Sequence, residues 1–145
     1  MRTPAAVMTS LMAVFGSQAL ADSPLDPYRW HNRILLVFAP SDNDERLGTT
    51  RNMVREHESG FVERHLITGT LLANEGIFDG QPLNAVRTES LRKRYTVGRS
   101  DFVVLLIGKD GGVKLRLTRP PEATELFELI DSMPMRRQEM QESSG

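Results

Sequence analysis

The chain has 145 residues, a formal net charge of −1 and no cysteine. A chain of this length suits a single domain. The lack of cysteine excludes disulfide exchange and zinc–thiolate sites, and the near-neutral charge gives no general attraction to nucleic acid or anionic lipid, so we expect no nucleic-acid partner.

The first residues have the pattern of a secretory signal peptide. Met1 and Arg2 precede a short apolar run, and Ala19-Leu20-Ala21 has the small residues of a cleavage site. The run is too short to span a membrane, and no other long apolar run follows. We therefore expect a signal peptide over 1–21, a periplasmic or secreted location after cleavage near Ala21, and no membrane insertion of the mature protein.

The mature chain begins with a lead-in segment, residues 22–33, followed by a first strand. The strand is predicted at 34–39, where the sequence ILLVFA is entirely apolar. We expect the lead-in aromatic residues Tyr28 and Trp30 to pack against this strand.

A helix follows the first strand. Its apolar face predicts a span from about 44 to 57, with Gly60 ending it. A weaker strand is predicted at about 64–72. The segment 73–88 is predicted to be a long loop, with or without a short hairpin, and loops of this length are often functional.

The second half has stronger patterns. It contains in order a helix, a buried strand, a turn rich in glycine, an alternating strand, a helix opened by two prolines, and a polar tail that we expect to fray. The corresponding residues are 89–95, 102–107, 109–112, 113–117, 122–133 and 135–145.

This order of elements predicts an α/β protein with a thioredoxin-like fold over 34–134. A parallel, right-handed strand–helix–strand unit comes first, and an antiparallel hairpin with a covering helix comes second. We expect a central mixed β-sheet of about four strands flanked by helices.

Short sequence blocks carry a family resemblance. The YTVG segment at 95–98, the apolar run after it and the KDGG turn resemble the second half of thioredoxins and peroxiredoxins. Three further blocks resemble an exported bacterial family of unknown function, whose domain also occurs in vertebrate secreted and matrix proteins, including those with sushi repeats. These blocks are residues 28–33, 106–116 and 126–140. The resemblance implies the thioredoxin-like fold and brings no established reaction.

The junction between the first strand and its helix is where redox members of this fold place two cysteines. The helix dipole lowers the pKa of a thiol there. In this chain the aligned positions hold Asp42 and Glu45, with Asn43 and Asp44 between them. The position of the usual cis-proline holds Asp101 or a close neighbour, and we expect a trans bond there. Carboxylates cannot exchange disulfides, so thiol redox activity is excluded.

Two interpretations of this acidic stretch stay open. Asx residues at a helix start commonly cap the helix. Alternatively, Asp42, Asp44, Glu45 and Asp101 converge at one end of the sheet and bind Ca²⁺, Mg²⁺ or an arginine-rich peptide. The helix dipole disfavours a cation there. Arg46 and Arg99 are close enough in the alignment to neutralise the cluster, so we expect neither a metal nor a cofactor.

Other polar residues give weaker indications. His57 and His65 flank two glutamates, but their spacing matches no metal signature. Ser41 lacks the surroundings of a hydrolase nucleophile. The turn at 108–112 lacks the order of a phosphate-binding loop. Lys109 and Lys114 mark either a recognition face or ordinary solvated charge.

These features favour a non-redox module that binds a peptide, a protein or a component of the cell envelope. One alternative is an enzyme that uses the acidic junction with or without a metal, although no catalytic residue is identified. Another is a partner of a redox system that acts by docking only. The predicted binding residues are Asp42, Asn43, Asp44, Glu45, Arg99, Asp101, Lys109 and Lys114.

Overall fold

The computed structural model describes residues 23–145, so the predicted signal peptide and its cleavage site lie outside the described residues. The elements are the 3-10 turn Asp26–Tyr28, β1 (Arg33–Phe38), α1 (Glu45–Glu56), α2 (Glu58–Glu63), β2 (Leu66–Leu71), β3 (Gly76–Phe78), β4 (Gln81–Leu83), α3 (Ala85–Tyr95), β5 (Val103–Ile107), β6 (Val113–Leu117), α4 (Ala123–Asp131) and α5 (Pro134–Ser143). Within this part of the chain no helix is long and apolar enough to cross a membrane.

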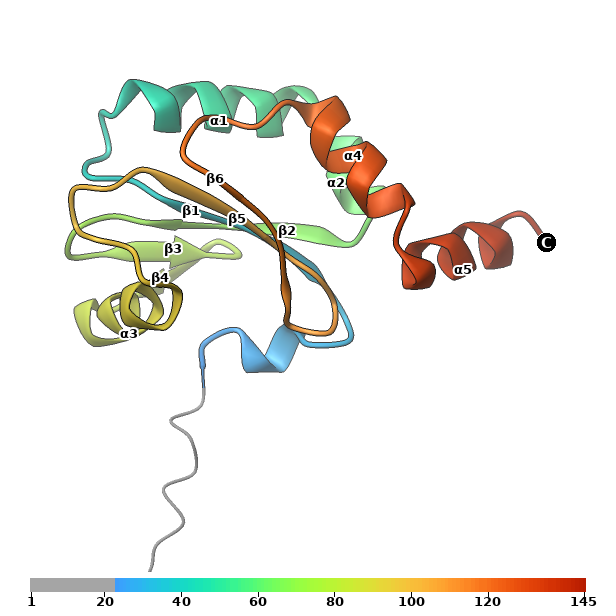
Figure 1. Cartoon of the computed structure of the whole chain (residues 1–145), viewed down its shortest axis with the longest axis horizontal. Coiled ribbons are helices and arrows are strands. Elements are labelled where there is room, and N and C mark those ends of the chain that lie inside the picture. The colour runs from blue at the N-terminus through green and yellow to red at the C-terminus, as the bar shows by residue number, and fades with distance from the viewer. Residues whose placement is uncertain (1–22) are drawn as a thin grey trace, which may run out of the picture.

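The strands form one mixed sheet in the order β4-β3-β2-β1-β5-β6 (Figure 1). β1 and β2 pair in parallel, and β5 runs antiparallel to both β1 and β6. The order β2-β1-β5-β6 follows the predicted connection of a parallel unit to an antiparallel hairpin. The thioredoxin-like prediction is therefore confirmed.

The sheet has six strands and not the predicted four, because the segment expected to be a long loop forms the β3–β4 hairpin. Asp79 and Gly80 make its two-residue turn, with φ angles of 49° and 76°. Positive φ at both positions suits the right-handed twist of the flanking strands, and Asp-Gly is a favoured pair for it. The same segment also begins α3 at Ala85, four residues before the predicted start, with Asn84 accepting a hydrogen bond from the Arg87 N–H.

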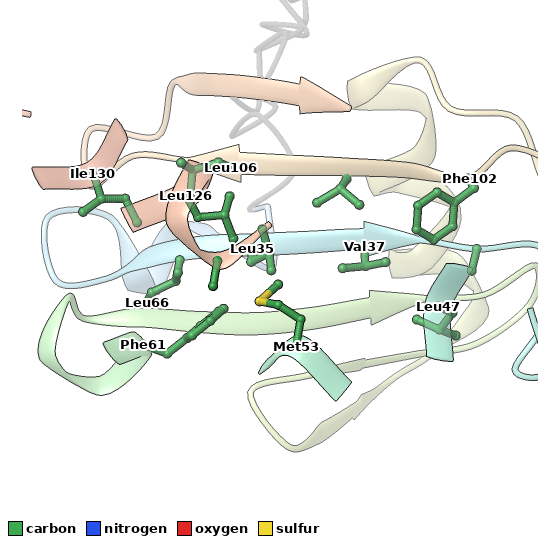
Figure 2. Packing of buried hydrophobic residues seen from close by; sticks show 13 residues of the cluster. Leu35, Val37, Leu47, Met53, Phe61, Leu66, Phe102, Leu106, Leu126 and Ile130 are labelled. Atoms are coloured by element: carbon green, nitrogen blue, oxygen red, sulfur yellow. The ribbon is translucent and has the colours of Figure 1, made fainter. Parts of the chain in front are cut away.

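Both faces of the central strands are buried, which explains why β5 and the part of β1 after Arg33 are unbroken apolar runs. Alternate residues of β1 point to opposite faces. Leu35 and Val37 join a cluster with α1, α2 and α4, and Figure 2 shows this packing. Leu36 and Phe38 join a second cluster with α3 on the other face. Figure 1 shows α1 and α3 on opposite sides of the sheet.

The prediction that Gly60 ends the first helix is wrong. α1 ends at Glu56, and Gly60 lies inside the short helix α2. The ring of Phe127 lies so close to Gly60 that a Cβ there would be 2.7 Å from it. A glycine is therefore required by this close approach of α4, while Phe61 anchors α2 in the core.

The lead-in packs as expected with one of its two aromatic residues. Tyr28 contacts the α3-side cluster and meets the ring of Phe78 edge-on at 4.9 Å. Trp30 is 59% exposed, so its predicted packing is wrong. Its backbone N–H instead donates to the carbonyl of Lys109 at 2.6 Å, which ties the lead-in to the β5–β6 turn.

The tail does not fray, because α5 is attached to the sheet by an ion cluster. The Glu139 carboxylate accepts hydrogen bonds from both terminal nitrogens of Arg33 at 3.2 Å and from Lys109 Nζ at 2.5 Å. Arg33 is 1% exposed and Lys109 is 7% exposed. Beside them, Arg136 of α5 pairs with Asp131 at 3.0 Å. The charged residues of the tail thus serve as its anchor.

Replacing Glu139→Gln is expected to destabilise the protein by about 2 kcal/mol at neutral pH, because two buried cations lose their charged partner. Burial raises the pKa of Glu139. Hydrogen bonds from Arg33 and Lys109 lower it by more than burial raises it, so the pKa lies below the usual 4.5. This stabilisation is complete above the ordinary pKa and is lost as the pH falls through the lowered one. Urea unfolding at pH 7 and near pH 3 measures both effects.

The matched control is Glu142→Gln on the same helix. Glu142 is exposed and contacts only Gln138 among the charged and polar side chains of 23–145. We expect its free energy of unfolding to change by less than about 0.5 kcal/mol. An equal effect of both substitutions would contradict the anchoring role of Glu139.

Candidate functional site

The acidic junction between β1 and α1 is primarily a helix cap. Asp44 is the N-cap of α1, and its Oδ1 accepts from the backbone N–H of Arg46 at 2.9 Å. The Arg46 guanidinium also donates to both oxygens of Asp44, at 3.0 and 2.7 Å. These hydrogen bonds lower the pKa of Asp44. The capping interpretation is therefore confirmed for Asp44.

The other acidic residues have separate local partners. Asp42 accepts from Arg51 at 2.9 Å. Asp101 accepts from the backbone N–H of Gly98 at 2.7 Å and so closes the turn before β5. Residues 23–145 contain no group of three or more His, Asp or Glu side chains placed to hold a metal ion. The carboxylates therefore do not converge as the cation-site interpretation requires.

The two arginines expected to neutralise the junction have different positions. Arg46 does so through Asp44, and its guanidinium carbon lies 4.9 Å from the centre of the Phe102 ring. Arg99 is directed elsewhere and lies 3.7 Å from Glu89 of α3. The expectation that Arg99 neutralises the junction is wrong, because its side chain pairs with Glu89 of α3.

The remaining predicted binding residues also have internal partners. Lys114 pairs with Asp110 at 2.8 Å across the turn. Lys109 is buried against Glu139 and lies 2.8 Å from Nδ1 of His65. Lys109 is therefore closed to a partner, whereas Lys114 is exposed and its charge is balanced locally by Asp110. His57 is apart from this group and contacts the Met53 carbonyl.

Asn43 and Glu45 complete the junction. The Asn43 side chain accepts from the Ser41 hydroxyl at 2.7 Å, which stiffens the turn before α1. Glu45 lies exposed in the first turn of α1, where a carboxylate interacts favourably with the positive end of the helix dipole. Both residues therefore have structural roles at the start of the helix.

A groove of about 460 Å³ opens beside this junction, between α1 and β2. Its floor is apolar and is formed by Val37, Leu47 and Val54. Its polar lining consists of Thr50, Arg51, Arg55, Thr68 and Thr70. The groove exists because Leu66, Thr68 and Thr70 point to one face of β2, and α1 covers β1 more fully than β2.

A second hollow of about 310 Å³ adjoins the groove, and Arg51 and Thr70 line both. The second hollow lies between Asp42 of the junction and the β3–β4 hairpin, which contributes Ile77 and Pro82. The junction and the 73–88 segment were separate candidates in the sequence. The tertiary structure brings them together on one surface.

Sequence analysis missed the groove residues Arg51, Arg55, Thr68 and Thr70. The alternation of Leu66, Thr68 and Thr70 was a usable signal, because it indicates a strand face that is not fully covered. The arginines gave none, since they lie on a helix face like any solvated charge.

A family model with the description "Domain of unknown function (DUF4174)" matches residues 24–139. The chain belongs to the DUF4174 family. The sequence resemblance to a domain family of unknown function is thus supported, and the family description assigns no activity.

Curated relatives of this DUF4174 chain are much longer proteins. Coiled-coil domain-containing protein 80 of Danio rerio is 29% identical in an alignment of 140 positions that covers 83% of this chain and 16% of that protein. Sushi repeat-containing protein SRPX2 of Rattus norvegicus is 28% identical over 120 residues, covering 80% and 26% respectively. The chain therefore spans about a quarter or less of the relatives described here.

Solved structures with a similar fold are peroxiredoxins. The reduced 2-Cys peroxiredoxin of Plasmodium vivax has a TM-score of 0.61 at 19% identity, over 79% of this chain and 84% of that one. Thioredoxin peroxidase I of Plasmodium yoelii has a TM-score of 0.60 at 18% identity, over 79% of each chain. At this identity the likeness establishes the fold alone.

The substitution Asp44→Ala is expected to lower the free energy of unfolding by about 1 kcal/mol, because the first turn of α1 loses its cap. Asp42→Ala is the matched control and should be nearly silent, since its pair with Arg51 is exposed. Thermal melts with a chelator and with millimolar Ca²⁺ or Mg²⁺ measure both. A metal-induced rise in melting temperature that both substitutions abolish would restore the cation-site interpretation.

Proposed function

We propose that this protein is a non-redox binding module that accepts an extended peptide segment of a partner in the groove beside α1. The observation that carries the proposal is the continuity of the two hollows through Arg51 and Thr70. Together they form an elongated surface along α1 toward the β3–β4 hairpin, which suits an extended chain better than a compact ligand.

The chemistry of the surface indicates the kind of peptide. Val37, Leu47 and Val54 offer an apolar floor for one aliphatic side chain. Arg55 has no carboxylate partner within 4.0 Å among residues 23–145, and it lines the groove at this end. The other end carries Asp42 and Glu75. We infer a peptide with an acidic residue near Arg55, an aliphatic residue next to it, and a basic residue toward the hairpin.

Three other hypotheses have less support. A thiol mechanism is excluded by the absence of cysteine. An enzyme using the acidic junction would require carboxylates that act together, whereas Asp42, Asp44 and Asp101 each have a separate local partner. Docking to a redox protein remains compatible with the groove, but nothing in the groove selects such a partner.

Selection of random displayed peptides on residues 22–145 tests the groove. We expect enriched peptides with the acidic–aliphatic–basic order, and we expect Thr68→Trp to weaken them at least about tenfold by filling the groove. Thr118→Trp, at an exposed position beyond β6, is the matched control and should not weaken them. Arg55→Glu, which leaves the packing intact, should select against the acidic residue.

Peptides that bind Thr68→Trp as well as the unmodified protein would refute the groove as the site, provided that both melt at similar temperatures. A selection that enriches no peptide would refute peptide binding itself.

We also propose that the protein is exported. The support is the Ala19-Leu20-Ala21 pattern after a short apolar run. Amino-terminal sequencing of the protein from a cell-envelope fraction is expected to begin at Asp22. A purified envelope form that retains Met1 would contradict cleavage at this position.

A further inference from the structure

Helix α3 carries a strip of basic side chains on its outer face. Arg87, Lys93 and Arg94 are exposed. Within residues 23–145 none of the three forms an ion pair within 4.0 Å of a carboxylate, and the guanidinium carbon of Arg94 lies 5.6 Å from the centre of the Tyr95 ring. The only acidic residue of α3, Glu89, faces Arg99 at 3.7 Å. The strip is therefore a local concentration of positive charge in a chain whose formal net charge is −1.

Helix stability explains only part of this strip. Lys93 and Arg94 lie in the last turn of α3, where cations interact favourably with the negative end of the helix dipole. Arg87 lies in the first turn, which contains no acidic residue, and there a cation opposes the dipole. Its side chain contributes to no described ion pair. Arg87 therefore destabilises α3 slightly and forms no ion pair that offsets this, which favours a role in contacting a partner.

The geometry of the strip limits what it can bind. Arg87 and Arg94 are seven residues apart, so they lie on one face of the helix about 10 Å apart along its axis. Lys93 flanks that face. Three cations on a strip one helix wide match a short segment with two or three carboxylates. They are too few and too narrow for a nucleic-acid backbone or a membrane plane, which reward many cations at once.

We propose that the outer face of α3 docks a short acidic peptide segment of a partner protein, with Arg87 and Arg94 each holding one carboxylate. Planar guanidinium groups pair with carboxylates through two parallel hydrogen bonds. In an extended chain, about three residues span the distance between the two arginines. The strip lies on the sheet face opposite α1 and the groove (Figure 1), so it forms a second surface that does not depend on peptide binding in the groove.

The test is fluorescence anisotropy with a labelled hexaglutamate peptide and the protein comprising residues 22–145. The peptide is expected to bind at low salt, and Arg87→Glu should weaken it about fivefold or more because an attractive contact becomes repulsive. Arg137→Glu makes the same charge change on α5, at an exposed position outside the described ion pairs. This control should change the affinity less than about twofold.

Stability separates a lost contact from a damaged fold. Arg87→Glu places a carboxylate in the first turn of α3, so its melting temperature should stay equal or rise while binding falls. Thr68→Trp, which fills the groove, should leave hexaglutamate binding unchanged, so the two proposals fail independently.

Three results would overturn the α3 proposal. The first is no binding of hexaglutamate at low salt. The second is an equal loss with Arg87→Glu and Arg137→Glu, which would mean that only overall charge matters. The third is tighter binding, through Arg87, of a thymidine oligonucleotide or of phosphatidylglycerol vesicles than of hexaglutamate, which would assign the strip to nucleic acid or lipid.

Discussion

One carboxylate, that of Glu139, joins the first strand, the β5–β6 turn and the last helix. Glu139 on α5 holds Arg33 at the start of β1 and Lys109 in the β5–β6 turn. Each of these residues lies in one of the three sequence blocks that carry the family resemblance, at 28–33, 106–116 and 126–140. Because Arg33 and Lys109 are buried cations, the sheet tolerates them only while α5 supplies the opposite charge. The cluster therefore fixes the position of α5 against the start of β1 and against the β5–β6 turn.

The sheet itself offers little for recognition at its edges. β6 presents the charged side chains of Lys114 and Arg116, and β4 contains Pro82, which cannot donate a ladder hydrogen bond. Additional strands are therefore discouraged on both sides. The two proposed binding surfaces lie instead on the faces of the domain, where α1 leaves β2 partly uncovered on one side and α3 exposes basic residues on the other.

The strand–helix junction occupies the place where redox proteins of this fold carry their cysteines, but in this chain it holds no thiol. A helix begins directly after a buried strand, and its N-terminus requires an acceptor for exposed N–H groups. In this chain Asp44 supplies that acceptor, and Arg46 neutralises it. The position that activates a thiol in a redox protein has become a cap. The groove proposed for peptide binding lies beside this cap, and Arg51 lines both the groove and the hollow next to Asp42.

The sequence by itself determined the elements whose cause is local. The apolar runs of β1 and β5, the glycine turn before β6 and the Asx cap of α1 each depend on neighbouring residues, and the thioredoxin-like order follows from them. The tertiary structure alone decided the rest. Arg33 and Glu139 are 106 positions apart, and the groove depends on how far α1 covers β2. No periodicity records such long-range pairing, because burial of a charge and depth of a groove exist only after the layers have packed.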